Sequence, residues 1–104
     1  MTGQQPTFGQ RLRELRKAKN LTQRELAERV AARLRKEGRS FDFTYLSKIE
    51  KDRTEPPSVT LITELARVLD ADPNELITLG LRQRLDRGRL EEALARAKAQ
   101  EEDE

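Results

Sequence analysis

Five helix-start signals divide the chain up to Gly80 into short segments, and their spacing limits the possible folds more than any other feature of the sequence. Thr7 with Gln10 and Thr22 with Glu25 form capping boxes, in which side chains bond the free backbone amides at a helix start. The residues after each signal place apolar side chains three and four apart, which is the helical period. The pattern therefore predicts an all-α fold of short connected helices. The remaining start signals are Asp42, Ser58 and Asp72.

The first two helices have expected boundaries. The first is expected over residues 8–19 and ends at Asn20, a residue type that tolerates the left-handed conformation of a helix stop. The second is expected from about 23 to 36, because Leu34 stays on its apolar face. Gly38 is the expected terminator of this second helix.

Three further helices are expected after residue 40. The third begins at Asp42 and must end before Pro56 and Pro57, because proline has no amide to donate within a helix. The fourth follows the proline pair. The fifth is expected to be short, with Pro73 at its first position and Gly80 closing it.

The segments predict one small domain with extensions at both ends. Residues 1–7 are polar and are expected to be a flexible arm. Residues 8–80 form the predicted domain, and residues 81–104 form a helical tail with an acidic end. Within the tail, one face of a sixth helix is expected to carry Leu90, Ala93, Leu94 and Ala97.

The residue types that the chain lacks narrow its function. None of the 104 residues is cysteine or histidine, which excludes a disulfide framework, a thiolate zinc site and the usual general base. We therefore expect no metal, no cofactor and no enzymatic activity. No apolar run is long enough to span a bilayer and no secretory leader is visible, so we expect a cytoplasmic protein that does not cross a membrane.

The charge is unevenly distributed along the chain. The net charge of +2 is made of +6 in residues 1–55 and −4 in residues 56–104. A basic half attached to an acidic half is typical of a protein whose first half meets a polyanion. A charged, solvated surface explains the same numbers, so charge alone leaves both interpretations open.

Ordered sequence segments carry a family resemblance. LTQRELAERV at 21–30 and FDFTYLSKIEKDRTEPPS at 41–58, together with LRELRKAKNLTQ at 12–23 and LARVLDADPNELI at 65–77, appear at nearly the usual spacings. They resemble the helix-turn-helix proteins of the phage Cro and repressor type, also called the xenobiotic-response-element family. The resemblance covers about residues 8–80. It implies a five-helix, repressor-like DNA-binding domain and a regulator of transcription that binds double-stranded DNA.

The chain departs from that family at one place. Between Val30 and Phe41 lie ten residues, AARLRKEGRS, where the family has one or two. An extended second helix and a longer connection are therefore expected in place of the tight turn. The basic insertion, which includes Arg39, either reaches flanking phosphates or is a surface extension.

Four residues of the third helix are expected to meet base edges. By the resemblance, Phe43, Thr44, Ser47 and Lys48 occupy the base-reading positions. Threonine and serine exchange hydrogen bonds with bases, lysine donates to guanine, and phenylalanine packs on a thymine methyl. For Phe43, core packing beside Phe41 is the alternative interpretation.

Other polar residues are expected to contact phosphate. The family commonly uses the position of Gln23 for this contact, at a helix start whose free amides favour an anion. The glutamate at position 50 is expected to serve structure, because a carboxylate facing phosphate would repel it. Tyr45 either bonds a phosphate or packs against the second helix. The full set of expected phosphate contacts is Gln23, Arg24, Arg39, Tyr45, Lys51 and Arg53.

A homodimer is expected, because two copies double the contacts and place their recognition helices about 34 Å apart, one turn of DNA. The alternative is a tail that packs on its own domain or stays mobile. The expected interface residues are Leu79, Leu81, Leu85, Leu90 and Leu94.

The sequence thus favours a dimeric, sequence-specific transcriptional regulator, and a repressor that occupies a near-palindromic operator more than an activator. A protein-interaction module is the alternative, because the same fold occurs in antitoxins whose extra segment masks a toxin. Here the tail after Gly80 would be the masking segment for a protein partner.

Overall fold

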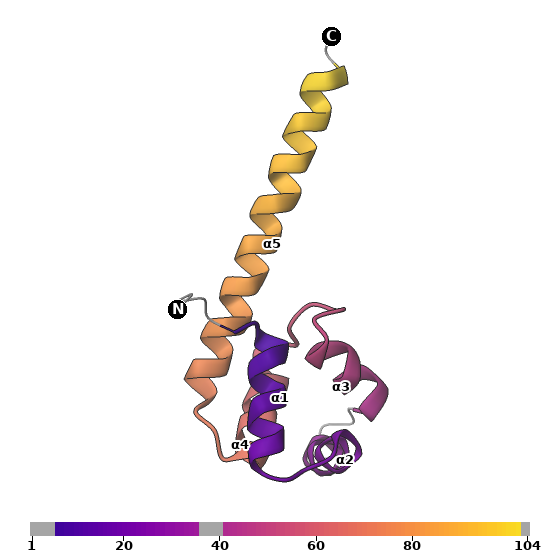
Figure 1. Ribbon diagram of the computed structural model, residues 1–104, viewed down its shortest axis with the longest axis vertical. Helices are drawn as coiled ribbons and strands as arrows, with labels where there is room; N and C mark the ends of the chain where they lie inside the picture. Colours follow the sequence, from indigo (N-terminus) through magenta and orange to yellow (C-terminus); the bar gives the residue numbers. More distant parts are fainter. Residues whose placement is uncertain (1–5, 36–40, 103–104) are drawn as a thin grey trace.

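The computed structural model describes residues 6–35 and 41–102, and all regular structure in these residues is helical (Figure 1). This confirms the predicted all-α fold of five helices. Their bounds are α1 Phe8–Ala18, α2 Gln23–Leu34, α3 Phe43–Glu50, α4 Val59–Leu69 and α5 Pro73–Glu102.

The helix starts are held by the predicted caps. The amide of Gln10 donates to the Thr7 hydroxyl at 3.1 Å, and the amide of Thr7 donates back to the Gln10 side chain at 3.0 Å. Thr22 and Glu25 repeat this exchange at 3.0 and 2.9 Å, and the Thr22 amide lowers the pKa of the Glu25 carboxyl. Asn20 has the expected left-handed conformation, with φ of 57°. The local rules of helix capping therefore place α1 and α2 correctly.

The apolar stripes of the five helices meet in one core. In Figure 1, α1, α4 and the first turns of α5 lie together, and α2 and α3 close the other side. The leucines that lie deepest come from different helices, so no pair of helices has a core of its own. The largest side chains at 2 % exposure or less are Phe8, Leu12, Leu26, Val30, Leu46, Ile49, Leu65, Leu69 and Leu76.

The second helix is extended, as the apolar pattern predicts. α2 continues past Val30 to Leu34, which it buries, and Arg35 is its C-cap. The expected end near residue 36 and the predictions for Gly38 and Arg39 lie outside the described residues.

The prediction that Gly80 closes the fifth helix was wrong. α5 continues through Gly80 and Gly88 as a single helix of 30 residues, so there is no separate sixth helix. At Gly80, a β-carbon would lie 3.2 Å from Ile62 and 3.3 Å from Pro56, so this glycine allows α5 to approach α4 closely. A glycine inside a helix costs only about 1 kcal/mol relative to alanine, which the surrounding helix-forming residues offset.

The second half of α5 leaves the body of the molecule (Figure 1). The radius of gyration is 16.4 Å, whereas a compact chain of this length is expected to have a value of about 13 Å. Leu85, Leu90 and Leu94 are each about 60 % exposed on this projecting segment. Among the described helices, none is long and apolar enough to cross a membrane.

Candidate nucleic-acid interface

A buried ion pair joins α1 to the end of α3. Arg16 donates from Nε and Nη2 to the two carboxylate oxygens of Glu50, at 2.7 and 2.9 Å. A third donor, Nη1, bonds the carbonyl of Leu21 at 2.8 Å. Both side chains are almost completely buried, at 10 % and 2 % exposure. The two-pronged geometry fixes the orientation as well as the distance of the two helices.

The same carboxylate also holds the start of α2. The side-chain amide of Gln23 donates to Oε1 of Glu50 at 3.0 Å. Glu50 therefore ties α1, α2 and α3 together, which confirms the expectation that it serves structure. Gln23, the expected phosphate contact, is thereby held in place at the N-terminus of α2.

α3 has one buried face and one outer face. Leu46 and Ile49 are at most 1 % exposed and anchor the helix in the core. On the outer face, Thr44 and Lys48 are exposed and Ser47 is half-buried. These three residues, with Phe43, lie within an arc of about 140° around the helix axis. The structure thus brings all four expected base contacts onto one surface.

Phe43 lies outside the core. Its side chain is 41 % exposed, which excludes the core-packing interpretation. The guanidinium carbon of Arg24 lies 4.5 Å from the centre of the Phe43 ring, an arrangement that a cation and an aromatic face favour. The first turns of α2 and α3 therefore meet at the surface through a stacked pair. The sequence did not predict this pair, because its two members lie in different helices and far apart along the chain.

Tyr45 takes part in packing. Its ring meets the ring of Phe41 edge to face, with centroids 5.5 Å apart and planes inclined by 70°. Phe41 is buried and Tyr45 is half-buried against the core. This contact supports a packing role for Tyr45, although its partner is Phe41 and not a residue of α2, and the phosphate contact stays a prediction.

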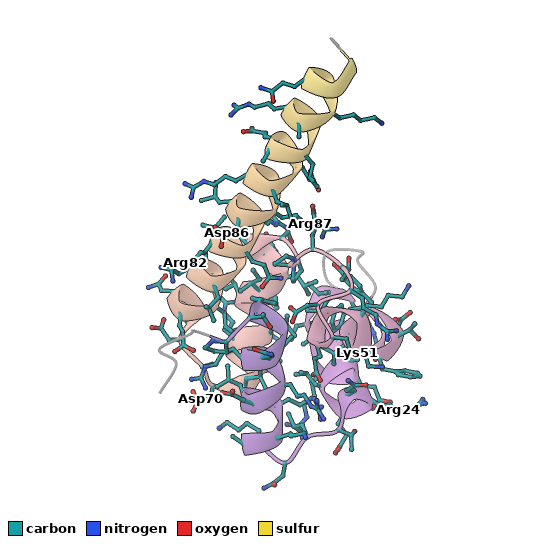
Figure 2. All side chains as sticks on the ribbon, turned by 45° about the horizontal axis from the view of Figure 1, so that its top comes forward. Arg24, Lys51, Asp70, Arg82, Asp86 and Arg87 are labelled. Carbon is teal, nitrogen blue, oxygen red and sulfur yellow. The ribbon has the colours of Figure 1, made fainter. Side chains whose placement is uncertain are left out.

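The remaining expected phosphate contacts flank the outer face of α3. Lys51 follows α3 directly, and Arg53 lies two residues further along; both are exposed. Figure 2 shows Arg24 and Lys51 on the side of the molecule formed by α2 and α3. Cations therefore border the candidate base-reading surface on two of its edges.

The hydrogen bonds of Asp52 and Gln83 at the exit of α3 were not predicted from the sequence. Asp52 adopts a left-handed conformation just after α3, and its carboxylate accepts a hydrogen bond from the amide of Gly9 at 3.1 Å. Gln83 accepts from the amide of Phe8 at 3.0 Å and donates to Asp52 at 3.4 Å. The exit of α3 is thus bonded to both α1 and α5. Only the left-handed tendency of aspartate was visible in the sequence.

The five leucines expected in a dimer interface do not share one face. Leu79 packs against the core. Leu81 and Leu85 form a proximal face beside Thr78, and Leu81 also borders Val59 and Ile62 of α4. At about 100° per residue, Leu90 and Leu94 lie on nearly the opposite side of α5. We call this second pair the distal face; it continues the side of the helix that buries Leu76 lower down.

Comparison with known proteins places the fold in a family. The helix-turn-helix domain family matches residues 7–79, which is most of the chain. No curated protein matches the chain closely enough to count as a relative.

Three solved structures are similar. The biofilm master regulator SinR, solved in complex with DNA, is 30 % identical, with 68 % of this chain and 98 % of the chain in that structure covered and a TM-score of 0.57. The restriction-modification controller protein C.AhdI from Aeromonas hydrophila is 39 % identical, with 66 % and 86 % covered and a TM-score of 0.54. The clp gene regulator ClgR from Corynebacterium glutamicum is 28 % identical, with 86 % and 84 % covered and a TM-score of 0.55. The chain therefore belongs to the helix-turn-helix family of DNA-binding transcriptional regulators of the Cro and xenobiotic-response-element type.

Proposed function

We propose that this protein is a repressor that binds a near-palindromic operator as a homodimer and blocks a promoter by occupying it. The observation that supports this proposal most is that α3 has one buried face and one exposed face. Leu46 and Ile49 are buried, whereas Thr44 and Lys48 face solvent. A helix that reads the major groove needs this division. The DNA complex of the relative SinR supports duplex DNA as the ligand.

The contacts divide into two classes. Thr44, Ser47 and Lys48 read bases, because hydroxyl and ammonium groups on the outer face of α3 reach donors and acceptors in the major groove. Lys51 and Arg53 contact phosphates and fix the position of the protein on the duplex. Gln23 does the same from the start of α2, where its bond to Glu50 already orients the side chain.

The homodimer forms through the proximal face of α5. A two-fold contact uses the same patch on both copies. Leu81 and Leu85 are 49 % and 61 % exposed and lie close to the folded body. An interface at this place holds the two copies of α3 at a fixed separation, as a palindromic site requires.

Selection from random-sequence duplexes with a salt titration tests the DNA proposal. The wild type is expected to enrich a two-fold motif, and Lys48→Ala is expected to relax it. With about six phosphate contacts, log affinity should fall with log salt at a slope of roughly −5. Lys98→Ala is the matched control, because it removes the same charge from the exposed end of α5. Absence of an enriched motif for the wild type contradicts the proposal.

The dimer proposal is tested by mass measurement in solution. Leu81→Ser with Leu85→Ser should give monomers, whereas Leu90→Ser with Leu94→Ser should leave dimers intact. The reverse result would move the interface to the distal face.

The distal face favours a second candidate function, a contact with another protein. Leu90 and Leu94 lie nearly opposite the proximal face, so a single two-fold contact does not use both faces. In the antitoxin-like alternative, this distal segment binds and masks a partner. Loss of partner binding in Leu90→Ser with Leu94→Ser, with DNA binding retained, is the expected signature.

A further inference from the structure

The stacked pair of Arg24 and Phe43 has a geometry suited to reading bases. Arg24 is the second residue of α2 and Phe43 is the first residue of α3, so both lie at helix N-termini on the outer surface. The ring supports one side of the guanidinium at 4.5 Å and restricts its orientation. An arginine held in this way loses less conformational freedom when its planar fork bonds a guanine edge.

The charges around the stack oppose a phosphate contact. The hollow beside it is lined by Arg24 and Arg35 and also by Glu28 and Asp42. Among the described residues that line the hollow, two carboxylates balance the two guanidinium groups, so these residues together carry no net positive charge. A phosphate placed there would meet both carboxylates, whereas the edge of a base carries no charge to be repelled.

We propose that Arg24 is a specificity-determining residue that reads guanine, next to the thymine whose methyl group Phe43 is already expected to contact. This rests on the proposed function, since it assigns part of the operator. Arginine bonds the O6 and N7 atoms of guanine with two donors, and an aromatic side chain packs on the thymine methyl. Consecutive bases are separated by about 3.4 Å along the duplex, comparable with the spacing within the stack.

The first test compares the enriched motifs and salt slopes of four proteins. Arg24→Ala should lose the preference for guanine at one position, by roughly 5- to 150-fold, with the salt slope almost unchanged. Phe43→Ala should lose the preference for the adjacent thymine and weaken that for guanine. Lys51→Ala is the control: it should weaken all sequences alike and reduce the salt slope by about 1.

The second test changes single atoms of the DNA. Replacing the thymine by deoxyuridine removes only the methyl group, and replacing the guanine by 7-deazaguanine removes only the N7 acceptor. The wild type should lose affinity with either substitution. Phe43→Ala should be indifferent to deoxyuridine, and Arg24→Ala should be indifferent to 7-deazaguanine.

The outcomes separate this inference from the proposed function. A wild-type motif that stays unchanged in Arg24→Ala, with a salt slope reduced by about 1, would make Arg24 a phosphate contact and overturn the inference alone. Failure of the wild type to enrich any motif would overturn the DNA proposal itself. Both side chains are exposed, so thermal unfolding of the variants should match that of the wild type and exclude misfolding as the cause.

Discussion

The two halves of α5 both carry leucines but have different surroundings. In the first half, Leu76 is fully buried and Gly80 lies against α4. In the second half, Leu90 and Leu94 are about 60 % exposed, and a β-carbon at Gly88 would meet no atom outside its own stretch of helix within 4 Å. Tertiary packing therefore holds the first half, whereas the second half is helical through local propensity and continuation from the body. The buried Leu76 therefore contributes strongly to the stability of the fold, whereas the exposed Leu90 and Leu94 contribute little to it.

Breaking an ion pair should distinguish the packed body, to which the first half of α5 belongs, from the projecting second half most strongly. Glu50→Gln leaves the buried guanidinium of Arg16 without its charge partner and should cost about 3–5 kcal/mol in the free energy of unfolding. Glu91→Gln breaks the exposed pair with Arg87, whose atoms are 3.6 Å apart, and should give no measurable change. Urea unfolding followed by circular dichroism measures both. Equal losses would contradict the distinction.

Leucine truncation gives the next largest difference. Leu65→Ala removes a side chain with 0 % exposure and should cost about 2–5 kcal/mol, because a cavity remains in the core. Leu94→Ala should change the stability of the monomer by less than about 0.5 kcal/mol. Thermal unfolding at low protein concentration measures the difference. A large loss from Leu94→Ala would mean that the distal face is buried in solution.

Replacing either of two glycines by alanine should change stability, but in opposite directions in the body and in the projecting half of α5. A β-carbon at Gly9 would lie 2.7 Å from the carbonyl oxygen of Glu50 and closer still to that of Ile49. Gly9→Ala should therefore destabilise the protein by about 1–3 kcal/mol. Gly88→Ala meets no such obstacle and should stabilise the distal helix by up to about 1 kcal/mol. Hydrogen exchange of α5 amides resolves the second effect, and slower exchange is the expected result.

The smallest effect concerns acid stability. The guanidinium of Arg33 donates to Glu64 and lowers the pKa of that carboxyl below its ordinary value. The resulting stabilisation is complete above the ordinary glutamate pKa and is lost as the pH falls through the lower pKa of the folded protein. Glu64→Gln should therefore flatten the acid side of the stability profile. Arg33→Ala should flatten the profile in the same way. An unchanged profile in both variants would mean that this ion pair does not contribute to the pH dependence of stability.

The features that follow from local sequence were predictable. Capping at Thr7, Thr22, Asp42 and Ser58 depends on residues three positions apart, so the pattern is present in the sequence itself. The outer face of α3 followed in the same way, because the helical period decides which residues oppose Leu46 and Ile49. The resemblance supplied which of those residues to regard as base contacts, and that part of the site stays a prediction.

The features that depend on long-range contacts were not predictable. Gly80 looks like a stop signal unless the neighbouring Pro56 and Ile62 are known. The bond between Asp52 and Gln83 joins residues 31 positions apart. The five leucines after residue 78 were expected to form one interface. Around a single continuous helix, however, they fall on different faces.

The unbroken α5 also has a mechanical consequence. Gln83 bonds Phe8 and Asp52, so it fastens α5 to the body where the helix leaves it. About 15 Å of helix lie between Pro73 and Gln83, and about 28 Å lie between Gln83 and Glu102. Because Asp52 lies at the exit of α3, a force that tilts the projecting segment would act through Gln83 on that exit.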